Sequence, residues 1–147
     1  MLGKTLKLIL KNLLRIKMKN NGINWEELSK IAWECRKNAY VLGPTKVGCA
    51  VLSINRKIYT GCNIEQIYRS HDIHAEVNAI SNMVSEGEEK LIALLVAAER
   101  DRFTPCGACM DWIYQFGGKD CLVAYQSKKN CKITIHKASE LMPFYPK

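Results

Sequence analysis

Three side chains in two short stretches of the sequence have the types and the number that hold a catalytic zinc ion. They are His74 in His74-Ala75-Glu76 and the pair Cys106 and Cys109. Zinc binds imidazole nitrogen and thiolate sulfur, and a catalytic site uses three protein ligands and leaves a fourth position for water. The two cysteines are three residues apart, so both sulfurs can lie on one face of a helix that begins near Cys106. The sequence therefore predicts one zinc site with these three ligands.

Glu76 follows His74 by two residues, which is too close for a second ligand on the same helical face. Its carboxylate can instead reach a water molecule at the open metal position, so we expect Glu76 to act as the general acid and base. A His-x-Glu stretch followed by Pro-Cys-x-x-Cys is the signature of zinc enzymes that deaminate nucleobases. Both halves of that signature are present, the second beginning at Pro105.

Two other interpretations of the cysteine pair are a non-catalytic zinc module and a redox site. A structural zinc site needs a fourth protein ligand, and a thioredoxin-like motif would not predict His-Ala-Glu at the start of a helix upstream. No second paired spacing occurs among the other candidate ligands, which are Cys35, Cys49, Cys62, Cys121, Cys131, His71 and His136. Both interpretations are therefore less favoured than a catalytic site.

Length and composition predict one globular domain. The chain has 147 residues, of which 48% are hydrophobic and 24% charged, enough for one full core and too few for two domains. Seven cysteines in no framework pattern indicate reduced thiols in a reducing compartment, so we expect a cytoplasmic protein. No apolar run is long enough for a membrane span.

The positive charge is concentrated at the N-terminus. The net charge is +8, of which +6 falls in residues 1–19, so the remaining 128 residues carry only +2. A nearly neutral domain argues against a nucleic-acid partner, because a polymer substrate needs a basic track. We expect residues 1–23 to be a basic N-terminal extension that is poorly ordered, or else the true start of the protein to be Met18. An amphipathic membrane-surface helix and a transit-like leader are the less favoured alternatives.

The hydrophobic pattern after residue 23 alternates between helical and strand periods. We expect a helix from Trp25 to Tyr40 behind a capping box at Asn24 and Glu27, and a hairpin turning at Asn55-Arg56. The other expected elements are strands at 47–53, 57–62, 91–98, 121–125 and 132–136, and helices from 74 to about 87 and from 105 to 116. This order predicts an α/β fold, a three-layer α-β-α sandwich with a mixed five-stranded sheet and the ligands at two helix N-termini.

Nearly everything after residue 24 resembles the small cytidine deaminase family, including its blasticidin-S deaminase branch. The resemblance rests on the two site stretches and on Val47-Gly48, Gly61-Cys62-Asn63-Ile64-Glu65 and Glu140-Leu141-Met142-Pro143. It implies that residues 24–147 form a zinc-dependent deaminase domain acting in pyrimidine salvage. It also implies that Asn63 and Glu65 bind ribose hydroxyls, that the Ala75 amide holds the base carbonyl, and that the Thr104 carbonyl receives the amino group.

Three departures from the family bear on the substrate. His74 replaces the usual cysteine, and Val77 replaces the usual arginine. The two replacements are consistent with each other, because three thiolates leave a zinc site negatively charged and benefit from a nearby cation, whereas one imidazole and two thiolates do not need one. Thr45-Lys46 stands where the family has Phe-Pro, and Met110-Asp111 where it has Arg-Gln. These changes predict an altered pocket around Lys46 and Met110.

We therefore expect deamination of a cytosine-type nucleoside, with cytidine or deoxycytidine giving the uridine product and ammonia. The alternatives are deamination of a modified or antibiotic aminonucleoside, and deamination of deoxycytidylate. Nucleosides are expected to be preferred over nucleotides, since only Lys46 and Arg69 offer themselves for a phosphate. The resemblance also implies a homo-oligomer, a tetramer or dimer.

Overall fold

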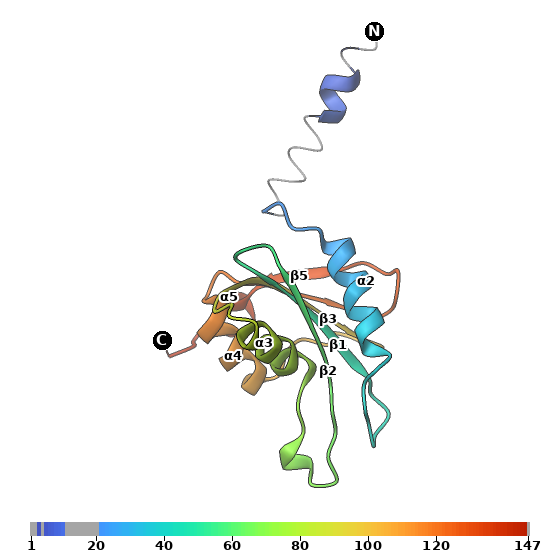
Figure 1. Cartoon of the computed structure of the whole chain (residues 1–147). Coiled ribbons are helices and arrows are strands. Elements are labelled where there is room, and N and C mark those ends of the chain that lie inside the picture. The colour runs from blue at the N-terminus through green and yellow to red at the C-terminus, as the bar shows by residue number, and fades with distance from the viewer. Residues whose placement is uncertain (1–2, 4, 11–20, 147) are drawn as a thin grey trace.

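The computed structural model describes residues 3, 5–10 and 21–146, so Met18 and most of the expected extension lie outside the described residues (Figure 1). In chain order its elements are α2 (Trp25–Arg36), β1 (Val47–Ser53), β2 (Ile58–Cys62), the 3-10 turn η1 (Arg69–His71), α3 (Ala75–Ser85), β3 (Leu91–Ala98), α4 (Gly107–Gly117), β4 (Leu122–Gln126), β5 (Thr134–Lys137) and α5 (Ala138–Leu141). No helix among these residues is long and apolar enough to cross a membrane.

The five strands form one mixed sheet in the order β2-β1-β3-β4-β5. β1 pairs antiparallel with β2 and with β3, β4 pairs antiparallel with β5, and only β3 and β4 run parallel. The parallel pair is joined through α4, as a crossover connection requires. The predicted five-stranded mixed sheet is confirmed.

Helices cover both faces of the sheet and give the predicted three layers (Figure 1). On one face α2 packs Leu28 and Ala32 against alternate residues of the central strands, including Leu95. On the other face α3 and α4 pack against the residues between them, such as Val96. Because a strand exposes successive side chains to opposite faces, the unbroken apolar run of β3 serves both cores.

Two glycines let helices approach the sheet closely. A Cβ on Gly48 would lie 2.1 Å from the Ala32 carbonyl oxygen of α2, and one on Gly61 would lie 2.3 Å from the Ala79 nitrogen of α3. No side chain fits at either distance, so α2 and α3 rest directly on the backbone of β1 and β2. The position of α3 matters for function because its N-terminus carries His74 and Glu76.

The first helix ends earlier than predicted. It starts as expected, with the Asn24 side chain accepting a hydrogen bond from the Glu27 amide at 3.1 Å, but it stops at Arg36 rather than Tyr40. Tyr40 instead pairs with the chain after β2, donating its amide to Asn63 and accepting from Glu65. Tertiary pairing has overridden local helix propensity here.

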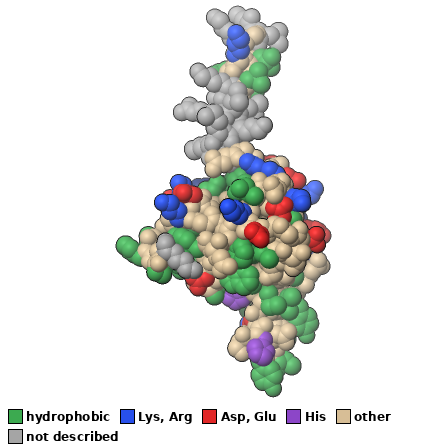
Figure 2. Space-filling model, turned by 60° about the vertical axis from the view of Figure 1, so that its left-hand side comes forward, with side chains coloured by type: hydrophobic (Ala, Val, Ile, Leu, Met, Phe, Trp, Pro, Cys, Tyr) green, Lys and Arg blue, Asp and Glu red, His purple; other side chains and the backbone are tan. Residues whose placement is uncertain are grey.

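The loop between β2 and α3 projects from the body of the domain (Figure 1). Ile67 and Tyr68 on this loop are 84% and 75% exposed. Figure 2 shows hydrophobic side chains gathered on this projecting part of the surface. The same loop carries Arg69 and Asp72, which line the cavity described below.

Candidate active site

Two helix N-termini bring the three predicted zinc ligands together. His74 is the N-cap of α3, Cys106 is the N-cap of α4, and Cys109 lies in the first turn of α4. His74 Nδ1 lies 3.4 Å from the Cys106 sulfur and 3.3 Å from the Cys109 sulfur. The three ligand atoms lie within 4.8 Å of one another. Residues 32 to 35 apart in sequence thus form one cluster.

The cluster has the dimensions of a zinc site. Bonds of about 2.1 Å to nitrogen and 2.3 Å to sulfur at a tetrahedral angle place the two ligand atoms about 3.6 Å apart. The observed nitrogen-to-sulfur distances of 3.3 and 3.4 Å are close to that value. One imidazole and two thiols are also the donors that zinc prefers. The residues present therefore fit a zinc ion with one position left open.

Burial opposes ionisation of one ligand thiol in the absence of a cation. Cys109 is 1% exposed, and its burial, followed by the nearby Glu76 carboxylate and Cys106, raises the pKa of its thiol. A divalent cation reverses this balance because the thiolate then gains a positive partner. We expect the buried sulfur to be deprotonated only when the metal is bound.

Glu76 is a buried acid beside these ligands. It lies in the first turn of α3, its side chain is 4% exposed, and burial raises the pKa of its carboxyl group. A carboxyl group with a raised pKa takes up and releases a proton near neutral pH more readily than an exposed one. The position and the environment of Glu76 suit a proton carrier.

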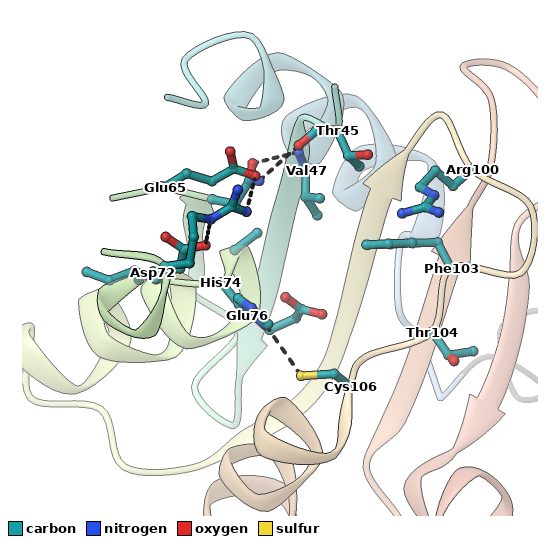
Figure 3. Close-up of a pocket in the computed structure, with 14 residues that line it drawn as sticks. Thr45, Val47, Glu65, Asp72, His74, Glu76, Arg100, Phe103, Thr104 and Cys106 are labelled. Carbon is teal, nitrogen blue, oxygen red and sulfur yellow. Dashed lines mark hydrogen bonds and ion pairs between the residues drawn. The ribbon is translucent and has the colours of Figure 1, made fainter. Parts of the chain in front are cut away.

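The site opens into a cavity of about 280 Å³ at the carboxyl ends of β2 and β3 (Figure 3). All the sequence-predicted site residues line it except Cys109, which is buried. The complete lining is Thr45, Val47, Asn63, Glu65, Arg69, Asp72, Ile73, His74, Ala75, Glu76, Arg100, Phe103, Thr104 and Cys106.

Asn63 and Glu65 line this cavity and also hold its walls. The Asn63 side chain accepts from the Val47 amide at 2.8 Å and donates to the Thr45 carbonyl at 3.0 Å. Glu65 accepts from the Leu42 and Gly43 amides at 2.6 and 2.8 Å. These two backbone hydrogen bonds are the main reason that the pKa of Glu65 is lowered. Glu65 is thus held as a carboxylate, with acceptor capacity left over.

Arg69 is neutralised by acids on the same wall. Its guanidinium lies 3.1 Å from Glu65 Oε1 and 2.8 Å from Asp72 Oδ2. The hydrogen bond to Asp72 raises the pKa of Arg69. Although Arg69 lines the cavity, its charge is already balanced by two carboxylates.

Ala75 and Thr104 present main-chain groups to the cavity. Ala75 is the first residue of α3, so its amide has no acceptor within the helix. Thr104 stands just before Pro105 in the loop between β3 and α4 and lines the opposite part of the cavity (Figure 3). The cavity lining thus includes a main-chain amide without an acceptor in its helix and a segment that carries a main-chain carbonyl.

The altered pocket predicted around Lys46 and Met110 is wrong in its location. The Lys46 ammonium donates to the Lys37 carbonyl at 3.3 Å, outside the cavity. Met110 is 2% exposed and packs in the core beneath α4. Strand alternation and helical phase turn both side chains away from the site. Of the departures from the family, Thr45 and the zinc ligand His74 line the cavity, and Lys46, Val77, Met110 and Asp111 do not.

Four lining residues were not singled out from the sequence. Two of them, Asp72 and Ile73, precede α3, and the other two are Arg100 and Phe103. The latter two lie in the loop after the carboxyl end of β3, where ligands bind in open α/β sheets. That position is the signal that could have identified them. Among the described residues, Arg100 has no ion pair, and Figure 3 shows its guanidinium turned toward the cavity.

A three-layer α-β-α sandwich with a histidine and two cysteines at helix N-termini, and a buried glutamate beside them, defines a zinc-dependent hydrolase. Comparison with known proteins agrees. The family model for the cytidine and deoxycytidylate deaminase zinc-binding region matches residues 23–125. The chain belongs to this family.

Several curated relatives are similar over much of the chain. A probable cytidine deaminase of Dictyostelium discoideum is 35% identical over 94 residues, which is 63% of this chain and 64% of that protein, so less than two thirds of that relative is matched. A cytidine deaminase of Sporosarcina psychrophila is 38% identical over 62% of this chain and 68% of its own length.

Solved structures share the fold. A crystal structure of cytidine deaminase from Mycobacterium leprae has a TM-score of 0.71 and 27% identity, covering 82% of this chain and 98% of that chain. One from Burkholderia pseudomallei has a TM-score of 0.75 at 24% identity with the same coverage of both. The predicted fold class and family are confirmed.

Proposed function

We propose that residues 24–147 form a domain that hydrolytically deaminates cytidine or deoxycytidine, giving uridine or deoxyuridine and ammonia. The observation that carries the proposal is the buried Glu76 beside His74 and the two cysteines at the end of a cavity. The naming of similar proteins as cytidine deaminases supports the choice of substrate.

His74, Cys106 and Cys109 would hold the zinc ion, which when bound supplies Lewis-acid activation of water. Glu76 takes a proton from the attacking water and delivers it to ring N3 as the oxygen bonds to C4. The same carboxylate then carries the second proton to the amino group, and the bond between C4 and that nitrogen breaks. One water is consumed and one ammonia released, so the atoms balance.

The remaining cavity groups suit a nucleoside. The Ala75 amide can donate to the base carbonyl, and the Thr104 carbonyl can accept from the 4-amino group. Asn63 and Glu65 line the same cavity, where they can hydrogen-bond ribose hydroxyls with the capacity that their backbone hydrogen bonds leave. A free base would leave these groups without their partners.

We predict that nucleosides are preferred over cytosine by at least about a hundredfold in kcat/KM, since each unmatched buried polar group costs about 1–3 kcal/mol. Steady-state ammonia release from cytidine, deoxycytidine and cytosine measures this. Glu65→Gln should erode the preference, because it removes a carboxylate acceptor from the sugar end of the cavity.

The matched control for that variant is Glu88→Gln, a buried glutamate whose partners Asn55 and Lys57 lie away from the cavity. It should keep the wild-type ratio of nucleoside to base. Ammonia release from none of the three compounds by zinc-loaded protein would rule out the proposed function.

Deoxycytidylate is a second candidate substrate, favoured by Arg100. With Arg69 balanced by Glu65 and Asp72, Arg100 is the cavity cation without an ion pair among the described residues. In Figure 3 it lies across the cavity from Glu65, so a sugar bound at Glu65 would turn its other end toward Arg100. A 5′-phosphate there would gain a charge-assisted hydrogen bond.

Replacement of Arg100 tests this second candidate. If a phosphate is bound, Arg100→Gln should lower kcat/KM for the 5′-monophosphate about tenfold or more and leave cytidine within about twofold, a loss in the range of one charged hydrogen bond. Arg102→Gln, an exposed neighbour outside the cavity, is the control. An Arg100→Gln protein that keeps the wild-type kcat/KM for the 5′-monophosphate would count against this second candidate.

The antibiotic aminonucleoside alternative loses the observation that favoured it, because Lys46 and Met110 do not line the cavity.

We propose a reducing, cytoplasmic setting, supported by seven cysteines that are all free of disulfides. We also propose a homo-oligomer, supported by the exposed Ile67 and Tyr68 on the projecting loop.

A further inference from the structure

Phe103 is the one phenylalanine, tyrosine or tryptophan among the described residues that line the cavity. It is partly buried, and it packs against the core formed by α3, β3 and α4. Figure 3 shows its ring reaching into the cavity toward Glu76, from the wall opposite Glu65 and Asp72. The ring therefore stands beside the position at which the reacting end of a substrate must lie.

The backbone fixes where this ring points. Arg102 adopts a φ of 49°, and the Thr104 amide donates to the Arg102 carbonyl at 2.9 Å, so the chain makes a tight turn with Phe103 at its centre. Pro105 and Cys106 follow directly. Phe103 is therefore three residues from the zinc ligand Cys106 in sequence. Its ring packs against the core on one side and lines the cavity on the other.

The other lining side chains provide little apolar surface for a flat ring to pack against. Thr45, Asn63, Glu65, Arg69 and Asp72 supply polar or charged groups, and Val47 and Ile73 supply small aliphatic contacts. A pyrimidine ring is planar and aromatic, and aromatic pairs gain attraction in offset-stacked or edge-to-face contact. Stacking of bases on aromatic side chains is general because every base has a π-face.

We propose that Phe103 binds the pyrimidine base of the substrate and selects for a planar ring. The inference rests on the proposed function, and it adds a specificity residue in the 99–104 loop. The contact orients the base so that its C4 edge faces Glu76, while the sugar end stays with Asn63 and Glu65. Its loss should weaken binding of planar ligands without removing the proton carrier.

The test compares binding of the product uridine with 5,6-dihydrouridine, whose saturated ring is not planar. Calorimetry on the zinc-loaded protein should show uridine bound about tenfold more tightly than dihydrouridine, as expected for an aromatic contact. Phe103→Leu, which keeps apolar volume but removes the ring, should weaken uridine binding about tenfold and reduce the discrimination to within about threefold. Phe103→Tyr should restore it.

Phe116→Leu is the matched control, because Phe116 is also partly buried and packs against the same core but does not line the cavity. It should keep the wild-type ratio of the two dissociation constants. A Phe103→Leu protein that keeps the wild-type ratio, or a Phe116→Leu protein that loses it equally, would overturn the inference. Failure of the wild-type enzyme to deaminate cytidine would instead count against the proposed function.

Discussion

Glu76→Gln should retain its fold and its zinc but lose about three orders of magnitude or more in turnover of cytidine. The change keeps the shape of the side chain and removes the group that takes and returns protons, while the metal ligands stay in place. General acid-base catalysis contributes about 10²–10⁴-fold, and here one carboxylate serves both proton transfers. Single-turnover kinetics with zinc analysis and circular dichroism on the same preparation measure this.

Glu88→Gln again provides the control, since Glu88 is 5% exposed and Glu76 is 4% exposed, so both variants alter a buried carboxylate. Loss of activity in the Glu76 variant with an intact Glu88 variant separates chemistry from the general cost of changing a buried acid. Near-normal turnover by Glu76→Gln would mean that another residue carries the protons.

The purified protein should contain about one zinc per chain, and a chelator should remove it together with all measurable activity. Because burial raises the pKa of the Cys109 thiol without a cation, metal loss should also leave that sulfur protonated. Metal analysis by atomic emission and recovery of activity on adding zinc back measure the dependence.

Two exposed cysteines, Cys106 and Cys131, provide a test variant and a control for zinc binding. Cys106→Ser should lower zinc content severalfold or more, because an alcohol is a much poorer zinc ligand than a thiolate. Cys131→Ser changes another exposed thiol, which lies outside the cluster, and should keep one zinc per chain. Equal metal content in both variants would exclude Cys106 from the site.

The sequence predicts local pattern well in this protein and predicts the direction of side chains less well. The hairpin and β3 are located correctly because alternation and apolar runs depend on the residues themselves. The end of α2 was misplaced because pairing of Tyr40 with the chain after β2 involves residues far apart in sequence. Helical continuation to Tyr40 was the locally reasonable choice.

Within the site, the spacing of His74, Cys106 and Cys109 sufficed to predict the cluster, since each lies in a motif tied to a helix start. The substrate end required three-dimensional structure. Lys46 is adjacent to Thr45 in sequence yet points elsewhere, and Arg100 belongs to no motif. Which side of a strand or loop faces a cavity depends on register and turns that a single sequence does not specify.

The residues proposed for catalysis lie at helix starts, whereas two residues proposed for substrate selection lie on an irregular loop. The metal cluster and Glu76 stand on the first turns of α3 and α4, and α3 rests directly on β2 at Gly61. Arg100 and Phe103 stand on an irregular loop between β3 and α4. Substitutions in that loop can therefore alter which nucleoside is accepted while the helices keep the chemistry intact. For an engineer, residues 99–104 are the segment to randomise when new substrates are sought on this scaffold.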